Sequence, residues 1–220
     1  MNSNWQKIGG WAALFEAFAY LAGFAFMLTV LQPAPGTSPA PAVQLAHVLG
    51  MVGLFKAWHV LIYVMFGAVL VVLVTALHEK LAAGTPPLMT VASAFGLIWA
   101  GLVIASGMIA NVGLDTVARM HALDPQQATV AWQTLGAVQD GLGGGVELVG
   151  GLWIILLSIA ALRQKILPRR LNYLGLIIGA AGILTIIPAL KDLGALFGLA
   201  QIVWFIWLGM YLLTTARRAP

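Results

Sequence analysis

The feature that most constrains this chain is a series of long segments with almost no charge. Residues 8–31 contain one charged side chain, Glu16, and four further runs contain none: 57–77, 88–112, 171–190 and 193–216. A helix needs about 20 apolar residues to cross about 30 Å of hydrocarbon, so each run is long enough. Charged residues make up only 8% of the sequence, against about 25% in soluble domains. The sequence therefore predicts a multi-pass membrane protein.

A sixth segment differs from the others because it combines an apolar run with polar and flexible residues. Between Asp140 and Gly151 there are two carboxylates, Asp140 and Glu147, and six glycines. An ionisable residue inside a membrane span is a functional-site hypothesis by default. We predict an all-α bundle of six transmembrane helices that forms one integral membrane domain over residues 1–220. The expected spans are about 8–31, 57–77, 88–111, 138–162, 171–190 and 193–214.

The basic residues predict the orientation of the chain. Eight of the eleven Lys and Arg residues fall in alternate connections and at the two ends, on one predicted side of the membrane. Because cytoplasmic loops are enriched in Lys and Arg, both termini are expected in the cytoplasm. The same placement at segment ends is typical of membrane topology, so the basic pI of about 9.7 does not indicate nucleic acid as a partner.

The intramembrane acids are the first candidates for a ligand or ion site. Counted from Arg163 at about 1.5 Å per residue, Glu147 is expected about 24 Å from the cytoplasmic boundary, with Asp140 further out on nearly the same helix face. Glu16 is expected about 13 Å from the inner side. If the first and fourth spans pack together, the three acids would form a relay for protons or cations. Alternatively, Glu16 and Glu147 form structural hydrogen bonds between helices, or Glu147 pairs with Lys56 or His59.

The glycines around Glu147 have two interpretations. Small residues allow helices to approach closely, and Gly141, Gly145, Gly150 and Gly151 could line such an interface. The three consecutive glycines, 143–145, could instead unwind the helix, as broken helices do at the binding sites of transporters. Both interpretations stay open at the level of sequence.

Other polar residues are sparse. Lys56 and His59 lie three residues apart, on one face near the outer boundary, where they could bind an anion or complement Asp140 and Glu147. Cysteine is absent, which excludes disulfides, thiolate metal sites and iron–sulfur clusters. No second span offers a histidine that could complete a bis-histidine haem site, and no zinc-binding spacing occurs. We expect no metal, no cofactor and no catalytic residue that the sequence can name.

Three residues of the last span share a helix face and could line an apolar pocket with one polar group: Gln201, Trp204 and Trp207. The alternative is that the two tryptophans pack in the core or face lipid. Trp5, Trp11, Trp58 and Trp132 are expected at the membrane interfaces, whereas Trp99 and Trp153 are expected deeper in the membrane.

The second half of the chain resembles a known family. The residues that carry the resemblance are 146–156 (VELVGGLWIIL), 161–163 (ALR), 167–170 (LPRR) and 174–179 (LGLIIG). This pattern is similar to the bacterial six-span membrane proteins grouped as domain of unknown function 4386. The resemblance implies a bacterial inner-membrane protein and carries over one polar position, Glu147. It implies no activity, because the family has none assigned.

Three functions fit these observations. The first is a transporter of a small molecule, or one linked to protons or cations, or a ligand-binding membrane protein, with a site built from Glu147, Asp140 and Glu16, with Lys56 and His59 as further candidates. The second is an integral-membrane enzyme acting on a lipid or quinone-like substrate. The third is a non-catalytic subunit or regulator that docks a second copy or another membrane protein. The lipid bilayer is the partner common to all three.

Overall fold

The computed structural model describes residues 3–31, 33, 40–144 and 147–216, and within these residues every regular element is helical. The elements are α1 (Ser3–Thr29), α2 (Pro41–Gly50), α3 (Val52–His59), the π-helical segment η1 (Val60–Met65), α4 (Phe66–Leu81), α5 (Pro86–His121), α6 (Pro125–Gln139), the π-helical segment η2 (Asp140–Gly144), α7 (Leu148–Gln164), α8 (Arg169–Leu184), the short 3-10 turn η3 (Pro188–Leu190) and α9 (Leu193–Ala216). The all-α prediction is confirmed for the described chain.

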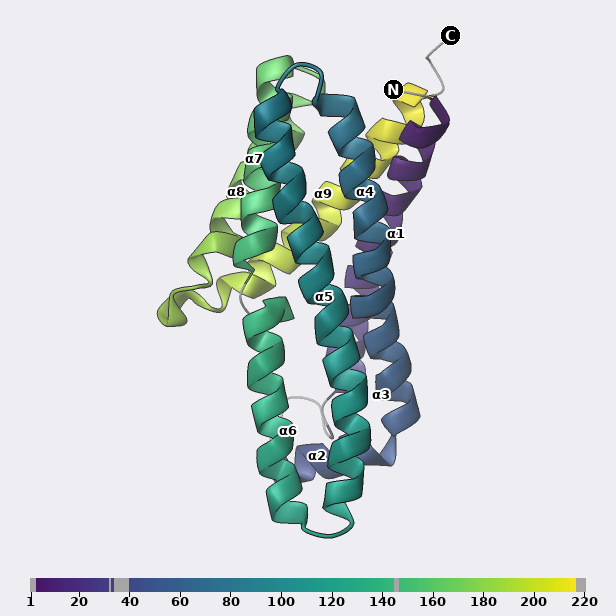
Figure 1. Cartoon of the computed structure of the whole chain (residues 1–220), viewed down its shortest axis with the longest axis vertical. Coiled ribbons are helices and arrows are strands. Elements are labelled where there is room, and N and C mark those ends of the chain that lie inside the picture. The colour runs from purple at the N-terminus through teal and green to yellow at the C-terminus, as the bar shows by residue number, and fades with distance from the viewer. Residues whose placement is uncertain (1–2, 32, 34–39, 145–146, 217–220) are drawn as a thin grey trace.

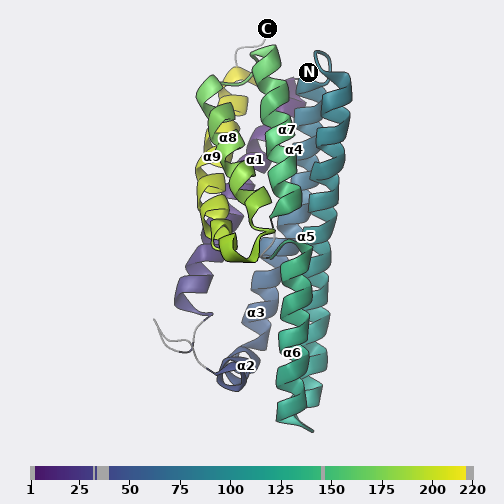
Figure 2. The same cartoon turned by 90° about the vertical axis from the view of Figure 1, so that its left-hand side faces the viewer.

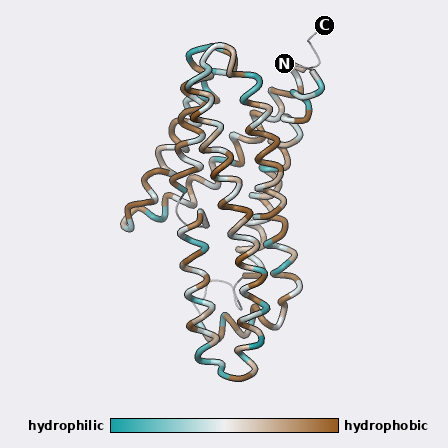
Figure 3. The backbone as a smooth tube through the Cα atoms, in the orientation of Figure 1, coloured by the Kyte–Doolittle hydropathy of each residue, from teal (hydrophilic) through white to brown (hydrophobic). Residues whose placement is uncertain are grey.

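The helices are arranged in two tiers (Figures 1 and 2). One tier, which we call the bundle, contains α1, α4, the first half of α5, α7, α8 and α9. The other tier, which we call the extension, contains α2, α3, the second half of α5 and α6. Figure 3 shows hydrophilic residues concentrated at the far end of the extension and at the opposite end of the bundle. A belt of apolar residues between these ends is the arrangement expected of a membrane protein.

Five helical stretches are long and apolar enough to cross a membrane: Asn4–Thr29, Val52–Leu81, Pro86–His121, Pro125–Gln164 and Leu193–Ala216. They correspond to five of the six predicted spans. The remaining prediction, 171–190, corresponds to α8, which has 16 residues and ends at Leu184. At about 1.5 Å per residue, α8 is about 24 Å long, shorter than a typical hydrocarbon layer. The chain then turns through η3 before α9 begins.

Helix α5 is longer than the predicted third span because it continues into the extension. Its 36 residues correspond to about 54 Å, well beyond the hydrocarbon thickness. The additional turns carry Asp115 and Arg119, which are exposed. A tight connection leads to α6, whose N-cap Asp124 accepts hydrogen bonds from the backbone N–H groups of Gln126 and Gln127, both at 3.0 Å. Pro125 follows at the first helical position, which suits its fixed φ.

Glycine contacts hold the bundle helices close together. A Cβ placed on Gly209 of α9 would lie 2.8 Å from the carbonyl oxygen of Gly10 in α1, and a Cβ on Gly151 of α7 would lie 2.6 Å from that of Gly179 in α8. No larger side chain fits at such distances without a shift of the backbone. Close approach of this kind provides the dispersion contacts that associate helices in lipid.

Polar side chains join the helices at the end of the bundle where the described chain begins and ends (Figure 1). The Gln6 side-chain amide of α1 donates to the carbonyl oxygen of Leu212 at 2.9 Å and to Thr215 at 2.6 Å. Gln164 donates to the carbonyl oxygen of Leu81 at 2.6 Å. Lys80 belongs to the same group of contacts, since its ammonium donates to the side-chain oxygen of Gln6 at 3.2 Å.

Candidate functional site

The Pro125–Gln164 stretch is interrupted within the glycine-rich segment. The π-helical η2 ends at Gly144, and α7 begins at Leu148 with Glu147 as its N-cap. Gly143 has a φ of 115°, a left-handed conformation that is strained for residues with a Cβ. The interpretation in which these glycines unwind the helix is therefore supported. Gly150 and Gly151 pack against neighbouring helices, as the other interpretation predicted. Gly145, the remaining glycine of the triplet, lies outside the described residues.

Glu147 is fixed in place by the end of α8. Its backbone N–H donates to the Thr185 hydroxyl at 2.8 Å, and that hydroxyl donates to the Gly182 carbonyl oxygen at 2.6 Å. A Cβ on Gly182 would lie 2.9 Å from the Glu147 carbonyl oxygen. The backbone at Glu147 is thus held against α8, and its side chain projects to the opposite side.

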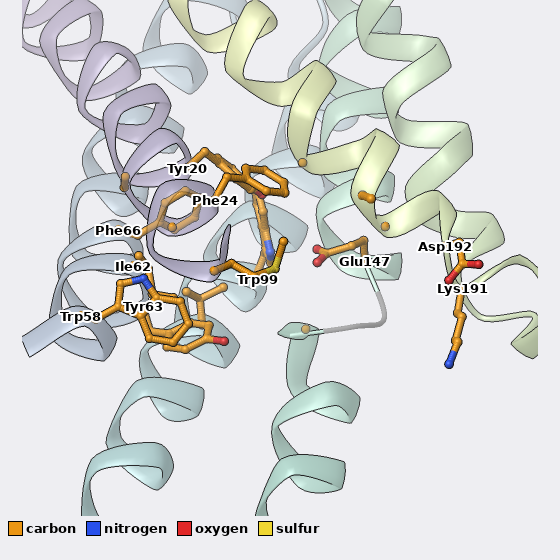
Figure 4. Close-up of a pocket in the computed structure, with 18 residues that line it drawn as sticks. Tyr20, Phe24, Trp58, Ile62, Tyr63, Phe66, Trp99, Glu147, Lys191 and Asp192 are labelled. Atoms are coloured by element: carbon orange, nitrogen blue, oxygen red, sulfur yellow. The ribbon is translucent and has the colours of Figure 1, made fainter. Parts of the chain in front are cut away.

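The Glu147 side chain borders a cavity of about 400 Å³ between the two tiers. Figure 4 shows its carboxylate directed toward Trp99 and the aromatic side chains beyond it. Helices α1, α3, α4, α5 and α9, the segment η1 and the turn before α9 supply the other walls. A volume of this size is in the range that holds small organic ligands.

Aromatic rings form most of the wall opposite Glu147, and we call them the aromatic wall: Tyr20, Phe24, Trp58, Tyr63, Phe66 and Trp99. Four of them, Tyr20, Phe24, Phe66 and Trp99, pack against one another. The Tyr20 and Phe66 rings meet edge to face with centroids 5.3 Å apart, and Phe66 and Trp99 do so at 5.7 Å. These edge-to-face contacts are a favourable aromatic geometry, so the wall is preorganised in the described structure.

Irregular backbone gathers around this cavity. The π-helical segment η1 contributes Ile62 and Tyr63, η2 contributes Gly143, and the turn after η3 contributes Lys191 and Asp192. Short π-helical segments are frequent at functional sites, and non-helical backbone at membrane depth is tolerated where it lines a cavity. The convergence of these segments identifies the cavity as the principal candidate site.

No basic side chain of the described residues forms an ion pair with Glu147. The single ion pair among them joins Lys56 to Asp115, with nitrogen and oxygen 2.7 Å apart. Lys191 borders the cavity, but Figure 4 shows its side chain directed away from the Glu147 carboxylate, with Asp192 beside it. The predicted pairing of Glu147 with Lys56 or His59 is therefore absent from the described part of the chain.

Lys56, His59 and Asp140 belong to a neighbouring region in the extension. The His59 ring nitrogen Nδ1 lies 3.1 Å from the Asn111 side-chain oxygen, while Lys56 is occupied by Asp115. His59 and Asp140 border a second cavity of about 300 Å³, which shares Trp58 and Tyr63 with the first. The structure thus separates Lys56 and His59 from Glu147.

Glu16 lies on α1 one turn before Tyr20 and is completely buried, with 0% of its surface exposed. Neither carboxylate oxygen has a hydrogen-bond partner among the described residues. It does not border the cavity. The structure therefore does not join Glu16, Asp140 and Glu147 into a continuous chain of contacts, although Tyr20 stands between Glu16 and the cavity.

The three residues proposed to line a pocket in the last span are not brought together. Gln201 and Trp204 are core residues, 0% and 1% exposed. Trp207 borders a shallow groove on the outer surface of α9. Trp204 thus packs in the core and Trp207 lies on the outer surface of the helix, as in the alternative that the sequence analysis gave for these two tryptophans. The described residues also contain no group of three or more His, Asp or Glu side chains that could hold a metal ion.

Sequence reasoning found Glu147 but missed the aromatic wall. An acid inside an apolar run is visible in the sequence, whereas Tyr20, Tyr63 and Trp99 come from different helices, and each reads as an ordinary apolar residue. Trp58 was assigned to a membrane interface and instead contributes to the cavity. A phenolic hydroxyl within an apolar run, as in Tyr20 and Tyr63, is the one signal that the sequence offered.

The comparison with protein families agrees with the resemblance seen in the sequence. The family model described as domain of unknown function 4386 matches residues 53–216. The chain belongs to this family. No curated protein and no solved structure matches it. The region matched to DUF4386 includes Glu147, Trp99 and Tyr63, while α1, with Tyr20 and Phe24, precedes it. The family and the apolar helices together identify a multi-pass membrane protein.

Proposed function

We propose that this DUF4386 protein binds a small, largely apolar molecule in the cavity between its two tiers, with Glu147 as the polar anchor. The observation that carries the proposal is the Glu147 carboxylate, which faces a cavity of about 400 Å³ and has no ion-pair partner among the described residues. A few polar groups in an apolar cavity fix the orientation of a ligand.

Transport is the form of this function that the helix geometry favours. The broken stretch between η2 and α7 and the π-helical η1 both border the cavity, and discontinuous helices mark the binding sites of many transporters. In this proposal the protein lies in the inner membrane of a bacterium with both termini in the cytoplasm, and the ligand crosses through the bundle. The enzyme alternative has less support, because the charged side chains that border the cavity among the described residues are Glu147, Lys191 and Asp192, and Figure 4 shows Lys191 directed away from the Glu147 carboxylate.

The first prediction concerns retained ligand. The wild-type protein and Glu147→Gln are purified in mild detergent and examined by native mass spectrometry. We expect a small molecule on the wild type that is reduced at least about tenfold on the variant, because loss of a buried charged contact weakens binding by this order.

Glu79→Gln is the matched control, since Glu79 is exposed near the end of α4 and its substitution makes the same chemical change. Glu79→Gln is expected to retain the molecule. Equal occupancy in all three proteins, or no adduct on any of them, would count against a ligand anchored by Glu147.

A further inference from the structure

The cavity presents one carboxylate to a set of aromatic faces, and this combination has a definite chemical preference. A carboxyl group in an apolar site either takes up a proton or, when ionised, needs a positive partner, because an unpaired buried charge is strongly unfavourable. The described residues supply no such partner. Lys191 and Asp192, which Figure 4 shows on the side of Glu147 away from the aromatic rings, have opposite signs and offset one another.

The aromatic wall adds to the preference for positive charge. A cation within about 6 Å of an aromatic ring centroid is attracted by the negative face of the ring, most strongly by tryptophan, and by up to about 2 kcal/mol or more when desolvated. Two of the six rings of the wall are tryptophans, Trp58 and Trp99. A cation placed between Glu147 and the wall would therefore be attracted from both sides.

The helix N-termini at the cavity do not reverse this preference. The N-terminus of a helix favours anions, and both α7 and α9 begin beside the cavity. Glu147 itself caps α7, and its backbone N–H is already donated to Thr185. Asp192 precedes α9, and its carbonyl oxygen accepts the N–H of Ala195 at 3.2 Å. Each N-terminus thus already has an acid of the protein beside it.

The wall also indicates what kind of cation fits. Apart from Glu147, its polar atoms are the hydroxyls of Tyr20 and Tyr63 and the ring nitrogens of the tryptophans, so a ligand with several hydrogen-bond donors would lose water contacts without replacing them. Building on the proposed function, we infer that the cavity binds a lipophilic organic cation, with its charge between Glu147 and the aromatic wall. Quaternary ammonium and phosphonium ions have this chemistry.

The test uses three probes of similar shape and different charge: tetraphenylphosphonium, tetraphenylborate and the neutral triphenylphosphine oxide. Each is measured by equilibrium dialysis against the full-length protein in detergent, with protein-free micelles as the blank, and the saturable component is recorded. We expect the phosphonium to bind the wild type at least about tenfold more tightly than the other two, as an added ionic and cation–π contact predicts.

Variants then locate the site. Glu147→Gln is expected to weaken phosphonium binding by about tenfold or more, while Glu79→Gln leaves it unchanged. Tyr63→Phe keeps the ring and should retain binding, whereas Tyr63→Leu removes it and should weaken binding. Because charge selectivity is measured on the wild type, the test does not depend on the folding of any variant.

Two outcomes overturn the inference. Binding of the borate or of the neutral oxide with equal or higher affinity removes the preference for cations but leaves a ligand cavity, and so leaves the proposed function standing. Absence of saturable phosphonium binding overturns the cation assignment, while the ligand retained on purification still decides the proposed function independently.

Discussion

Glu16 and Glu147 show how two identical side chains take different places in one bundle. Glu147 stands at a helix end and faces a cavity, whereas Glu16 lies in the middle of α1 and is enclosed on all sides. The side-chain amide atoms of Gln201, which is also fully buried, likewise have no hydrogen-bond partner among the described residues. Groups of this kind lower stability, because they lose their contacts with water and gain nothing equivalent.

Replacement of Glu16 by leucine is therefore expected to stabilise the protein. An unsatisfied buried polar group costs about 1–3 kcal/mol, and leucine has a similar volume without that requirement. The midpoint of thermal unfolding in detergent, followed by circular dichroism, should rise for Glu16→Leu and stay near the wild-type value for Glu79→Leu at the exposed end of α4. A lower midpoint for Glu16→Leu would mean that the carboxyl group makes a stabilising contact beyond those of the described residues.

At the scale of the helices, the packing of α7 on α8 depends on glycine. A Cβ on Gly151 would meet the Gly179 carbonyl oxygen at 2.6 Å and the backbone nitrogen of Ile183 at 2.9 Å, whereas a Cβ on Gly101 of α5 would meet nothing within 4 Å. Replacing each of these two helical glycines by alanine therefore separates the effect of helix packing on stability from the effect of intrinsic helix propensity.

Gly151→Ala is predicted to destabilise the protein by about 1–3 kcal/mol, the usual range for overpacking a close contact. Gly101→Ala is predicted to be neutral or to stabilise by up to about 1 kcal/mol, because alanine is the better helix former. Thermal unfolding of both variants in the same detergent measures the difference. Similar midpoints for the two variants would contradict the close approach of α7 and α8.

Five of the six predicted spans correspond to long apolar helices, because hydrophobicity summed over about 20 residues is a strong signal. The sixth span, 171–190, is not confirmed, because the run is apolar throughout but the helix ends at Leu184. The apolar residues that follow, Ile186 and Ile187, are exposed at 56% and 44%. Composition cannot distinguish a helix from an apolar turn, and Pro188 was the one local sign that the helix would stop.

The sequence predicted the acidic residue of the candidate site, Glu147, and the helix break beside it, but it did not predict which residues line the cavity. Glu147 stood out by its charge, and residues 143–145 stood out because consecutive glycines favour unwinding. The distance of Lys56 and Glu16 from Glu147 depends on how α1, α3 and α5 pack, which no spacing along one helix encodes. The aromatic wall was missed for the same reason, since its residues come from four helices and one π-helical segment.

At the scale of the whole molecule, the polar residues divide between two ends. Lys80 lies at one end, within 3.2 Å of the side-chain oxygen of Gln6, and the connection between α5 and α6 lies at the other (Figure 1). The positive-inside rule places the end with Lys80 in the cytoplasm, so the tip of the extension is predicted to face the outside.

The absence of cysteine from the sequence makes this orientation directly measurable. In spheroplasts treated with a membrane-impermeant maleimide, Gln126→Cys should be labelled, because it lies at the tip of the extension. Glu79→Cys should be labelled only after the membrane is permeabilised, and the wild type should not react at all. The opposite pattern would reverse the predicted orientation, and labelling of both variants in intact spheroplasts would contradict a membrane between them.

Three helical connections join the tiers beside the cavity, and they differ in continuity. Helix α5 and the stretch from α3 through η1 to α4 pass between the tiers without interruption, whereas η2 and α7 are separate helices. Bending between the two tiers is therefore easiest at the break between η2 and α7. Glu147 lies next to this break, so a change in the angle between the tiers would also change the width of the cavity. A rigid molecule bound beside Glu147 would fix both the angle and the width.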